Sequence, residues 1–250
     1  MSRLTFRFFS AALALLLSGL AHSAVADTVT VSVFGTDTET QVTRGFEQTY
    51  SDADDELTVN DDGTFGLNLD QRPANDVWQL NGLTASGDFD PIVNLGFVVT
   101  NTSASPADFV FTIALPVSPA LPAPTFMGAS ASFTVTDANF AGGASLTSTS
   151  PDPMFLGLID GAPALPLFDD PSSIVTPAGS LSDFQVLGLP GPTIPSGPVA
   201  SSIGIEIRFT LSPGDSASGT TSFIVEVPEP SSMLLVFSLI GTTAVVRRRV

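Results

Sequence analysis

The sequence predicts an all-β protein whose central part folds as an antiparallel, jelly-roll-like β-sandwich. Short runs rich in Val, Ile, Phe and Thr recur between clusters of Gly, Pro, Ser, Asn and Asp, which is typical of strands joined by turns. From Ile203 to Phe209 every second residue is apolar and the others are small or charged, so one face of that strand should meet water. No long helical segment is predicted between the two ends of the chain. This pattern favours two packed sheets.

The individual strands are predicted from two signals, apolar alternation within a run and turn residues on each side of it. The alternation is clear from Phe109 to Ile113, where the odd-numbered positions are apolar. The expected strands, in chain order, are Thr28–Phe34, Thr64–Leu69, Val77–Leu83, Ile92–Thr100, Asp108–Leu115, Ala131–Thr136, Leu181–Val186, Ser202–Leu211 and Thr220–Val227.

Two regions interrupt this order. The stretch from Pro116 to Pro124 carries four prolines and cannot be a central strand, so we expect an extended crossover between the sheets. The stretch from Ser148 to Pro198 is rich in Pro, Gly and Ser and has weak strand patterns. It is interpreted as long loops at one end of the sandwich, with a partly disordered insert as the alternative.

The charge of the central part is strongly negative. All 25 acidic residues lie between residues 27 and 230, against three arginines (Arg44, Arg72 and Arg208), which leaves a net charge of −22. Such a charge opposes binding to nucleic acid and to anionic lipid surfaces. It suits an exported protein that stays dispersed, or one that attracts Ca²⁺. The absence of cysteine means that the domain must be stable through its core alone.

Composition also excludes most catalytic chemistry. The chain has no cysteine and no lysine, and its single histidine, His22, lies in a segment expected to be removed. Ser-His-Asp, Cys-His and Ser-Lys nucleophiles and His- or Cys-ligated metals are therefore excluded. A two-carboxylate glycosidase stays open, although no pair of carboxylates is singled out. We expect a non-enzymatic protein without cofactor, with Ca²⁺ as the one ion left open.

The densest group of oxygen ligands lies in the acidic run, defined as Ser51 to Gly63. Its spacing fails the EF-hand pattern, because Leu57 stands where that loop needs Gly and Gly63 where it needs Glu. A solvated loop closed by an Asp-Gly turn is favoured. The alternative is a calcium site with Asp52, Asp54, Asp55, Asp61 and Asp62 as ligands.

Three further side chains invite a functional interpretation. Trp78 and Tyr50 are the only Trp and Tyr of the chain and could stack on carbohydrate. Trp78 falls within a predicted strand, so a place in the core is favoured for it. Arg44 and Arg72 are expected to neutralise neighbouring carboxylates.

The first 26 residues have the three parts of a secretory signal peptide. Arg3 and Arg7 give a positive start, Phe8 to Leu20 an apolar helix, and Ala24 and Ala26 a small-residue cleavage site, with cleavage after Ala26. An uncleaved anchor is the alternative. Residues 27–226 would then form the β-sandwich domain.

Residues 227–250 form a separate tail. The triplet Pro228, Glu229 and Pro230 precedes an apolar stretch and three terminal arginines. Prolines end regular structure and leave an extended joint that a protease can reach. The tail resembles the PEP-CTERM sorting signal of exported bacterial proteins. The resemblance implies transient inner-membrane anchoring, processing by an exosortase near the triplet, and delivery to the cell surface or extracellular matrix.

The apolar stretch is physically suited to an anchor. The 16 residues from Ser231 to Val246 carry no charge, and a helix over them is ~24 Å long, somewhat short of a ~30 Å hydrocarbon core. The arginines can reach the headgroups and fit the positive-inside rule. A buried C-terminal helix is the alternative. The expected anchor residues are Met233, Leu234, Leu235, Val236, Phe237, Leu239, Ile240, Val245, Val246, Arg247, Arg248 and Arg249.

A second resemblance covers part of the body. The segment from Trp78 to Asn101, continued by Phe109 to Pro116, is similar to a segment that recurs in PEP-CTERM-tailed proteins of unknown function. That resemblance implies no active site. The sequence therefore predicts a structural or adhesive protein among exopolysaccharide or biofilm components, with exosortase and the secretion machinery as partners, and no nucleic acid. The alternatives are a calcium- or carbohydrate-binding module and a polysaccharide hydrolase.

Overall fold

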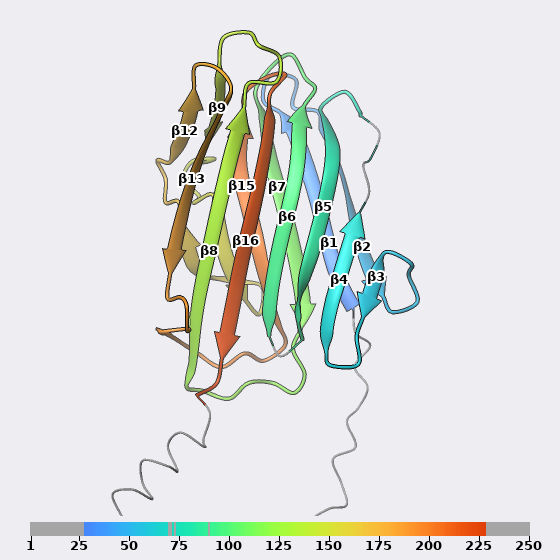
Figure 1. Cartoon of the computed structure of the whole chain (residues 1–250), viewed down its shortest axis with the longest axis vertical. Coiled ribbons are helices and arrows are strands. Elements are labelled where there is room, and N and C mark those ends of the chain that lie inside the picture. Colours follow the sequence, from blue (N-terminus) through green and yellow to red (C-terminus); the bar gives the residue numbers. More distant parts are fainter. Residues whose placement is uncertain (1–27, 70–71, 73, 90, 229–250) are drawn as a thin grey trace, which may run out of the picture.

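The computed structural model describes residues 28–69, 72, 74–89 and 91–228. In this part of the chain sixteen strands form two eight-stranded antiparallel sheets, and no helix is present (Figure 1). The prediction of an all-β, sandwich-like body is confirmed. The signal segment and residues 229–250 of the tail lie outside the described residues. Within the described residues no helix could cross a membrane.

The first sheet, sheet A, contains the N-terminal strand. Its main path in spatial order is β11 (Ala162–Leu167), β10 (Phe155–Ile159), β15 (Ser202–Leu211), β7 (Ala107–Pro116), β1 (Thr28–Asp37) and β2 (Thr43–Ser51), while β9 (Ala144–Thr147) pairs with β15 and with β12 (Ser173–Thr176).

The second sheet, sheet B, contains the C-terminal strand. Its main path is β13 (Ser180–Leu187), β8 (Thr125–Thr136), β16 (Ser216–Glu226), β6 (Ile92–Asn101), β5 (Trp78–Asp88), β4 (Thr64–Leu69) and β3 (Leu57–Val59), and β14 (Ile194–Ser196) pairs with β8.

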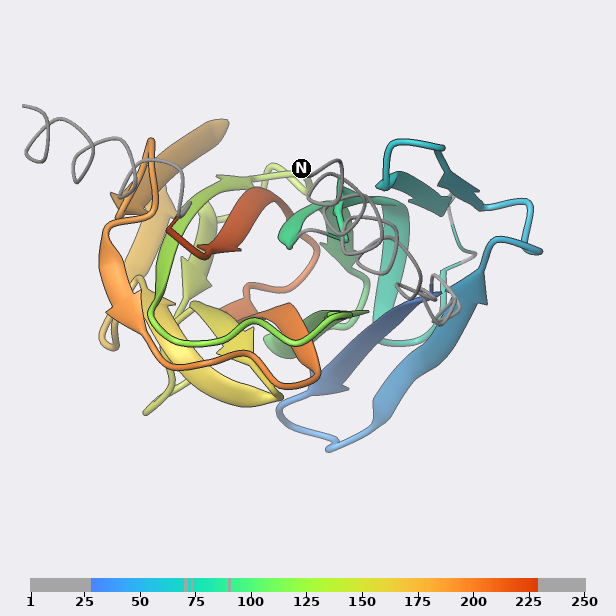
Figure 2. The ribbon, with the colours of Figure 1, turned by 90° about the horizontal axis from the view of Figure 1, so that it is seen from below.

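An end-on view shows the strands of the two sheets around a common interior (Figure 2). The inward-facing apolar side chains of both sheets form one buried core. The alternation predicted from sequence determines which side chains enter it: Ile203, Ile205 and Ile207 of β15 are fully buried. At the centre, the ring of Phe97 stacks on Phe111 of sheet A, with ring centroids 4.4 Å apart. Apolar and aromatic burial of this kind supplies most of the stability of a domain without disulfides.

All nine predicted strands are present, most of them longer than expected. Strand β8 begins at Thr125 rather than Ala131, and β5 extends to Asp88. The proline-rich crossover is also confirmed, because β7 ends at Pro116 in sheet A and the next strand belongs to sheet B. Within the crossover, Leu121 forms an isolated bridge with Val199.

The interpretation of residues 148–198 as long loops is wrong, because four strands lie there in addition to β13, which was predicted. Strand β10 is hydrogen-bonded between β11 and β15 and four of its five residues are buried, so it reads as a continuous apolar run without alternation. The hairpin from β10 to β11 turns at Asp160 and Gly161, whose φ angles are +52° and +75°. Positive φ at both positions is the type I′ turn that Asp-Gly favours. The Asp160-Gly161 dipeptide is therefore the sequence feature from which this hairpin could have been predicted.

The direction of β16 defines the two ends of the body. It starts after Asp215 at the upper end in Figure 1 and runs down to Glu226, from which the chain continues to Pro228. Strand β16 pairs with β6 on one side and with β8 on the other along its length. The upper end therefore lies one strand length from the start of the tail.

Candidate functional site

The outer face of sheet B carries rows of short polar side chains that cross the strands. Register places Thr84 opposite Gly96, Gly96 opposite Thr220, Thr220 opposite Ser132, and Ser132 opposite Phe184. Directly opposed residues of antiparallel strands point to the same face. The next row consists of Gly82, Val98, Ser218, Thr134 and Ser182. We call these two rows the hydroxyl face.

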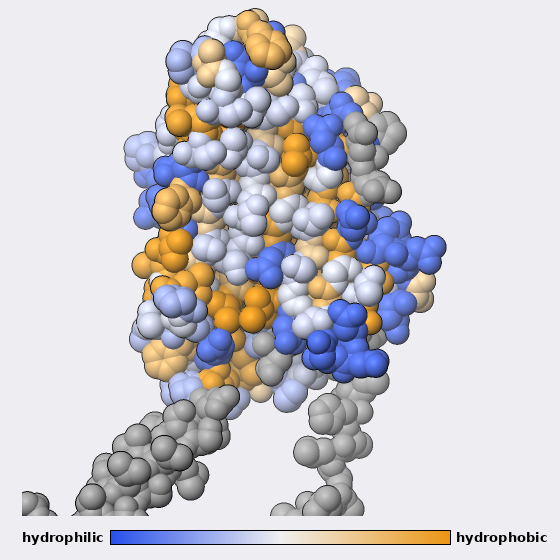
Figure 3. All heavy atoms as spheres, viewed as in Figure 1, coloured by the Kyte–Doolittle hydropathy of each residue, from blue (hydrophilic) through white to orange (hydrophobic). Residues whose placement is uncertain are grey.

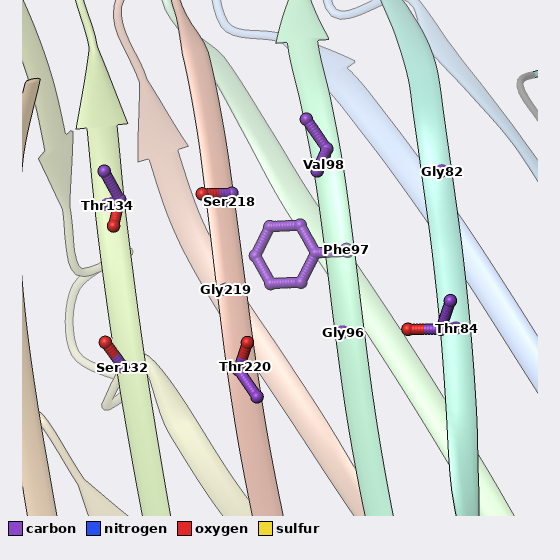
Figure 4. Close-up of a pocket in the computed structure, with 10 residues that line it drawn as sticks. All are labelled: Gly82, Thr84, Gly96, Phe97, Val98, Ser132, Thr134, Ser218, Gly219 and Thr220. Atoms are coloured by element: carbon purple, nitrogen blue, oxygen red, sulfur yellow. The ribbon is translucent and has the colours of Figure 1, made fainter.

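A hollow of about 330 Å³ lies in the hydroxyl face where glycines replace side chains (Figure 4). Gly96 contributes no side chain, and a Cβ atom there would stand 2.8 Å from Oγ1 of Thr84. Only glycine therefore leaves both the hollow and the threonine undisturbed. The lining residues are Gly82, Thr84, Gly96, Phe97, Val98, Ser132, Thr134, Ser218, Gly219 and Thr220.

Buried aromatic rings support the hollow from below. Gly219 points inward, and a Cβ atom there would approach Cε1 of Phe97 to 2.5 Å and Cδ1 of Phe133 to 2.9 Å. The two rings, with centroids 6.4 Å apart, occupy the space that a side chain at this position would need. The packed core thus holds the strands beneath the hollow in one arrangement.

The hydroxyl face is uncharged, although the body is strongly acidic. None of the ten lining residues has an ionisable side chain. In Figure 3 the centre of this face is pale, while strongly hydrophilic residues gather on the side where β3 and β4 lie. Side-chain hydrogen bonds order the hydroxyls, as between Thr134 and Ser182, whose oxygens are 2.7 Å apart.

Strand β13, which forms one edge of the hydroxyl face, carries exposed apolar side chains. Phe184 is 71% exposed and Val186 is 49% exposed, on the edge strand of the sheet. By register Phe184 lies beside Ser132, which lines the hollow. Hydroxyls next to an exposed ring can hydrogen-bond and pack against a polyhydroxylated ligand. The lining residues offer no group for acid–base chemistry.

The structure does not gather the acidic run into a metal site. Among the described residues, no group of three or more His, Cys, Asp or Glu side chains could hold a metal ion. The backbone N–H and the hydroxyl of Ser51 both donate to Oδ2 of Asp54, at 2.7 and 3.0 Å. Asp52, Asp55 and Asp61 are exposed.

The turn at the end of the acidic run has the form favoured from sequence. Gly63 adopts φ +86°, and its N–H donates to the carbonyl oxygen of Asn60. The hydroxyl and the backbone N–H of Thr64 both donate to Asp62, which lowers the pKa of that carboxyl. The carboxylates of Asp54 and Asp62 therefore accept hydrogen bonds from their own loop.

The two aromatic candidates and their arginines belong to the core and its border. Trp78 is 3% exposed and its Nε1–H donates to the carbonyl of Arg44, as a core position predicts. Arg44 pairs with Asp76 at 2.7 Å and lowers the pKa of that carboxyl. The guanidinium of Arg72 lies 3.8 Å from the centroid of the Phe46 ring. Among the described residues it forms no ion pair, and because its neighbour Asp70 is not among them, the role predicted for Arg72 stays a prediction.

Of the predicted sorting residues, the structure describes Pro228 alone, in irregular backbone after β16. Ala24, Ala26, Glu229, Pro230 and the anchor residues lie outside the described residues. The hydroxyl face was missed from sequence. The hydroxyl face could have been predicted from the alternation of Ser and Thr with apolar residues from Ser130 to Thr136. The strand prediction used only the apolar residues of that pattern.

Comparison with known proteins finds no family model that matches the chain and no curated protein that is similar to it in sequence.

Proposed function

We propose that the chain is an exported, non-enzymatic protein of the cell surface or extracellular matrix that adheres to neutral polysaccharide through the hydroxyl face. The observation that carries this proposal is the contrast between that face, which has no charge, and a body with a net charge of −22. A neutral glycan gains hydrogen bonds from Ser and Thr and meets no repulsion there, whereas an anionic polymer is repelled by the body.

The route to that location is the one that the two chain ends suggest. The proposal has the signal segment cleaved after Ala26 and the PEP-CTERM-like tail anchored transiently in the inner membrane as a helix. An exosortase then cuts near Pro228, Glu229 and Pro230. The sandwich of residues 27–226, jelly-roll-like in this proposal, is the part delivered.

Two other functions receive less support. A polysaccharide hydrolase needs a pair of carboxylates beside its substrate, and the residues that line the hollow include none. A calcium site in the acidic run needs converging oxygens, whereas Asp54 and Asp62 turn toward their own loop.

The glycan proposal is tested by affinity electrophoresis of the full-length chain in gels that contain the neutral or the anionic fraction of the host's exopolymer. We expect retardation by the neutral fraction only. Ser218→Glu, which extends a charged side chain into the hollow, should weaken retardation about tenfold, equivalent to ~1.4 kcal/mol.

The matched control is Thr30→Glu on the outer face of sheet A, which should be retarded like the unmodified protein. Equal retardation of both variants, or none by either polymer, would contradict the role of the hydroxyl face. Export is tested separately by intact mass. A species from Asp27 to near Pro230 in the extracellular fraction supports processing, and one that keeps Arg247 to Arg249 in the membrane means a permanent anchor.

A further inference from the structure

Two buried aspartates lie at neighbouring strand ends at the upper end of the sandwich. Asp137 directly follows β8 and Asp215 directly precedes β16, and the last pair of their ladder joins Thr136 to Ser216. Continued by one residue, this register sets Asp137 opposite Asp215. Both positions continue the inward-facing, odd-numbered residues of their strands, such as Val135. We call them the acidic pair.

Backbone hydrogen bonds hold both residues in line with the sheet. The N–H of Asp137 donates to the carbonyl of Gly179 at 2.8 Å, and the carbonyl of Asp215 accepts from the N–H of Asn101 at 2.9 Å. Oδ1 of Asp215 also accepts from the N–H of Ala138, the residue after Asp137, at 3.3 Å. The acidic pair is thus fixed by the ladder and not by a loose loop.

The carboxylates are buried with too few hydrogen-bond donors. Asp137 is 4% exposed and Asp215 is 1% exposed. Oδ1 of Asp137 is buried and has no hydrogen-bond partner among the described residues. Oδ2 of Asp215 accepts from the hydroxyl of Ser212 at 2.5 Å. An ionised carboxylate normally accepts several hydrogen bonds, and a buried one that lacks them is strongly destabilising.

No positive side chain of the body compensates the acidic pair. Among the described residues Arg44 pairs with Asp76, Arg208 pairs with Asp152 and Glu206, and Arg72 lies over Phe46. The sequence has no lysine. The three arginines that could neutralise a buried carboxylate in this part of the chain are therefore engaged elsewhere.

Another buried aspartate shows how the same fold satisfies a carboxylate that needs no ion. Asp37 is 5% exposed, and it accepts from the hydroxyl of Ser105 and from the backbone N–H groups of Thr40 and Glu39. These bonds, that of Ser105 first, lower the pKa of its carboxyl. The acidic pair has no such set of donors, so its charge calls for a different partner.

We propose that the acidic pair binds a hard divalent cation, with Ca²⁺ as the preferred ion. The two aspartates continue opposed positions of the inward face, Oδ1 of Asp215 accepts from the N–H of Ala138 beside Asp137, and Oδ2 of Asp215 accepts from the hydroxyl of Ser212. An all-oxygen set suits Ca²⁺ or Mg²⁺, whose remaining positions are filled by backbone carbonyls and water. With two carboxylates the site is weak, in the 10⁻⁴–10⁻³ M range typical of extracellular calcium modules.

The test is the melting temperature of the full-length chain in detergent, with chelator and with increasing Ca²⁺ or Mg²⁺. Trp78, the only tryptophan, pairs with Asn101 at the same end of the sandwich as the acidic pair, so its fluorescence can follow unfolding of this region. We expect a rise of about 5–10 °C when the free ion exceeds its Kd about a hundredfold. Asp137→Asn, which keeps the shape of the side chain, should abolish the rise, and Asp215→Asn should do the same.

Matched controls are Asp183→Asn on β13 and Asp54→Asn in the acidic run, both of which should keep the full rise. An equal rise in Asp137→Asn would overturn the proposal, because the ion would act elsewhere. No rise in the unmodified chain with either ion would also overturn it. Equilibrium dialysis should find one bound Ca²⁺ per chain, lost in Asp137→Asn. These readouts are independent of glycan binding.

Discussion

The acidic run and the acidic pair are both made of aspartates, but their surroundings differ. In the run, Asp52, Asp55, Glu56 and Asp61 are exposed, and Asp54 and Asp62 accept hydrogen bonds from their own loop. In the pair, both aspartates are buried, Asp215 accepts from two donors, and Oδ1 of Asp137 has no donor among the described residues. The acidic run is conspicuous in the sequence, yet its carboxylates are hydrated or accept hydrogen bonds from the loop.

Asp137 and Asp215, by contrast, are isolated in the sequence, and the fold buries their carboxylates away from water. Burial raises the free energy of a charge far more than proximity to other exposed charges does, because water screens the latter. The location of a cation site in an acidic protein is therefore better sought where carboxylates are buried with few donors than where they are numerous.

The largest expected effect concerns Asn101, which is fully buried beside the acidic pair. Its amide donates to the carbonyls of Ser105, Leu211 and Ser212 and its oxygen accepts twice from Ser103. Asn101→Ala leaves these groups unpaired and should lower the free energy of unfolding by about 3–5 kcal/mol in denaturant titration. Asn60→Ala in the acidic run should cost under about 1 kcal/mol. Similar losses at both sites would remove the contrast.

Neutralising one member of the pair should stabilise the calcium-free protein. Asp137→Asn removes a buried charge without donors, and we expect a gain of about 1–3 kcal/mol in chelator. The exposed counterpart, Asp55→Asn, should stay within about 0.5 kcal/mol. Denaturant midpoints at equal m-value measure both changes. A loss of stability in Asp137→Asn would mean that its carboxylate is satisfied after all.

Asp160 provides an intermediate case, an exposed carboxylate held by backbone. The N–H groups of Ala200, Ser202 and Ser201 lower its pKa to about 2. A folded pKa below the unfolded value of about 3.8 contributes stability that is present above pH ~4 and lost as the pH falls toward 2. Asp160→Asn keeps a turn-forming residue, so the drop in stability between pH 5 and pH 2.5 should become smaller. An unchanged drop would assign the acid sensitivity to other carboxylates.

The smallest effect is expected from the acidic run itself. The triple variant Asp52→Asn, Asp55→Asn and Asp61→Asn should change the free energy of unfolding by less than about 0.5 kcal/mol at 0.15 M salt. A change in the free energy of unfolding above about 2 kcal/mol, or loss of the calcium response in this variant, would indicate that the cation binds at the acidic run. Circular dichroism melts at low and physiological salt provide the measurement.

How much of this the sequence predicts depends on the range of the interactions. Strands with one wet face, such as β15, follow from alternation because burial on one side imposes a two-residue period. Strand β10 was missed because it is buried on both faces and has no period to detect. The acidic pair joins positions 78 residues apart, and only the register of β8 with β16 brings them together. The hydroxyl face likewise depends on the order of strands in sheet B.

Strand β16 has a mechanical consequence. It is 11 residues long, roughly 36 Å at ~3.3 Å per residue, and it leads straight into the tail at Pro228. Ladder hydrogen bonds to β6 and β8 lie across the strand. A pull on the tail along the strand axis therefore shears both ladders at once, and many bonds share the load instead of opening one after another. The force needed to pull β16 out of sheet B therefore depends on the full length of its two ladders.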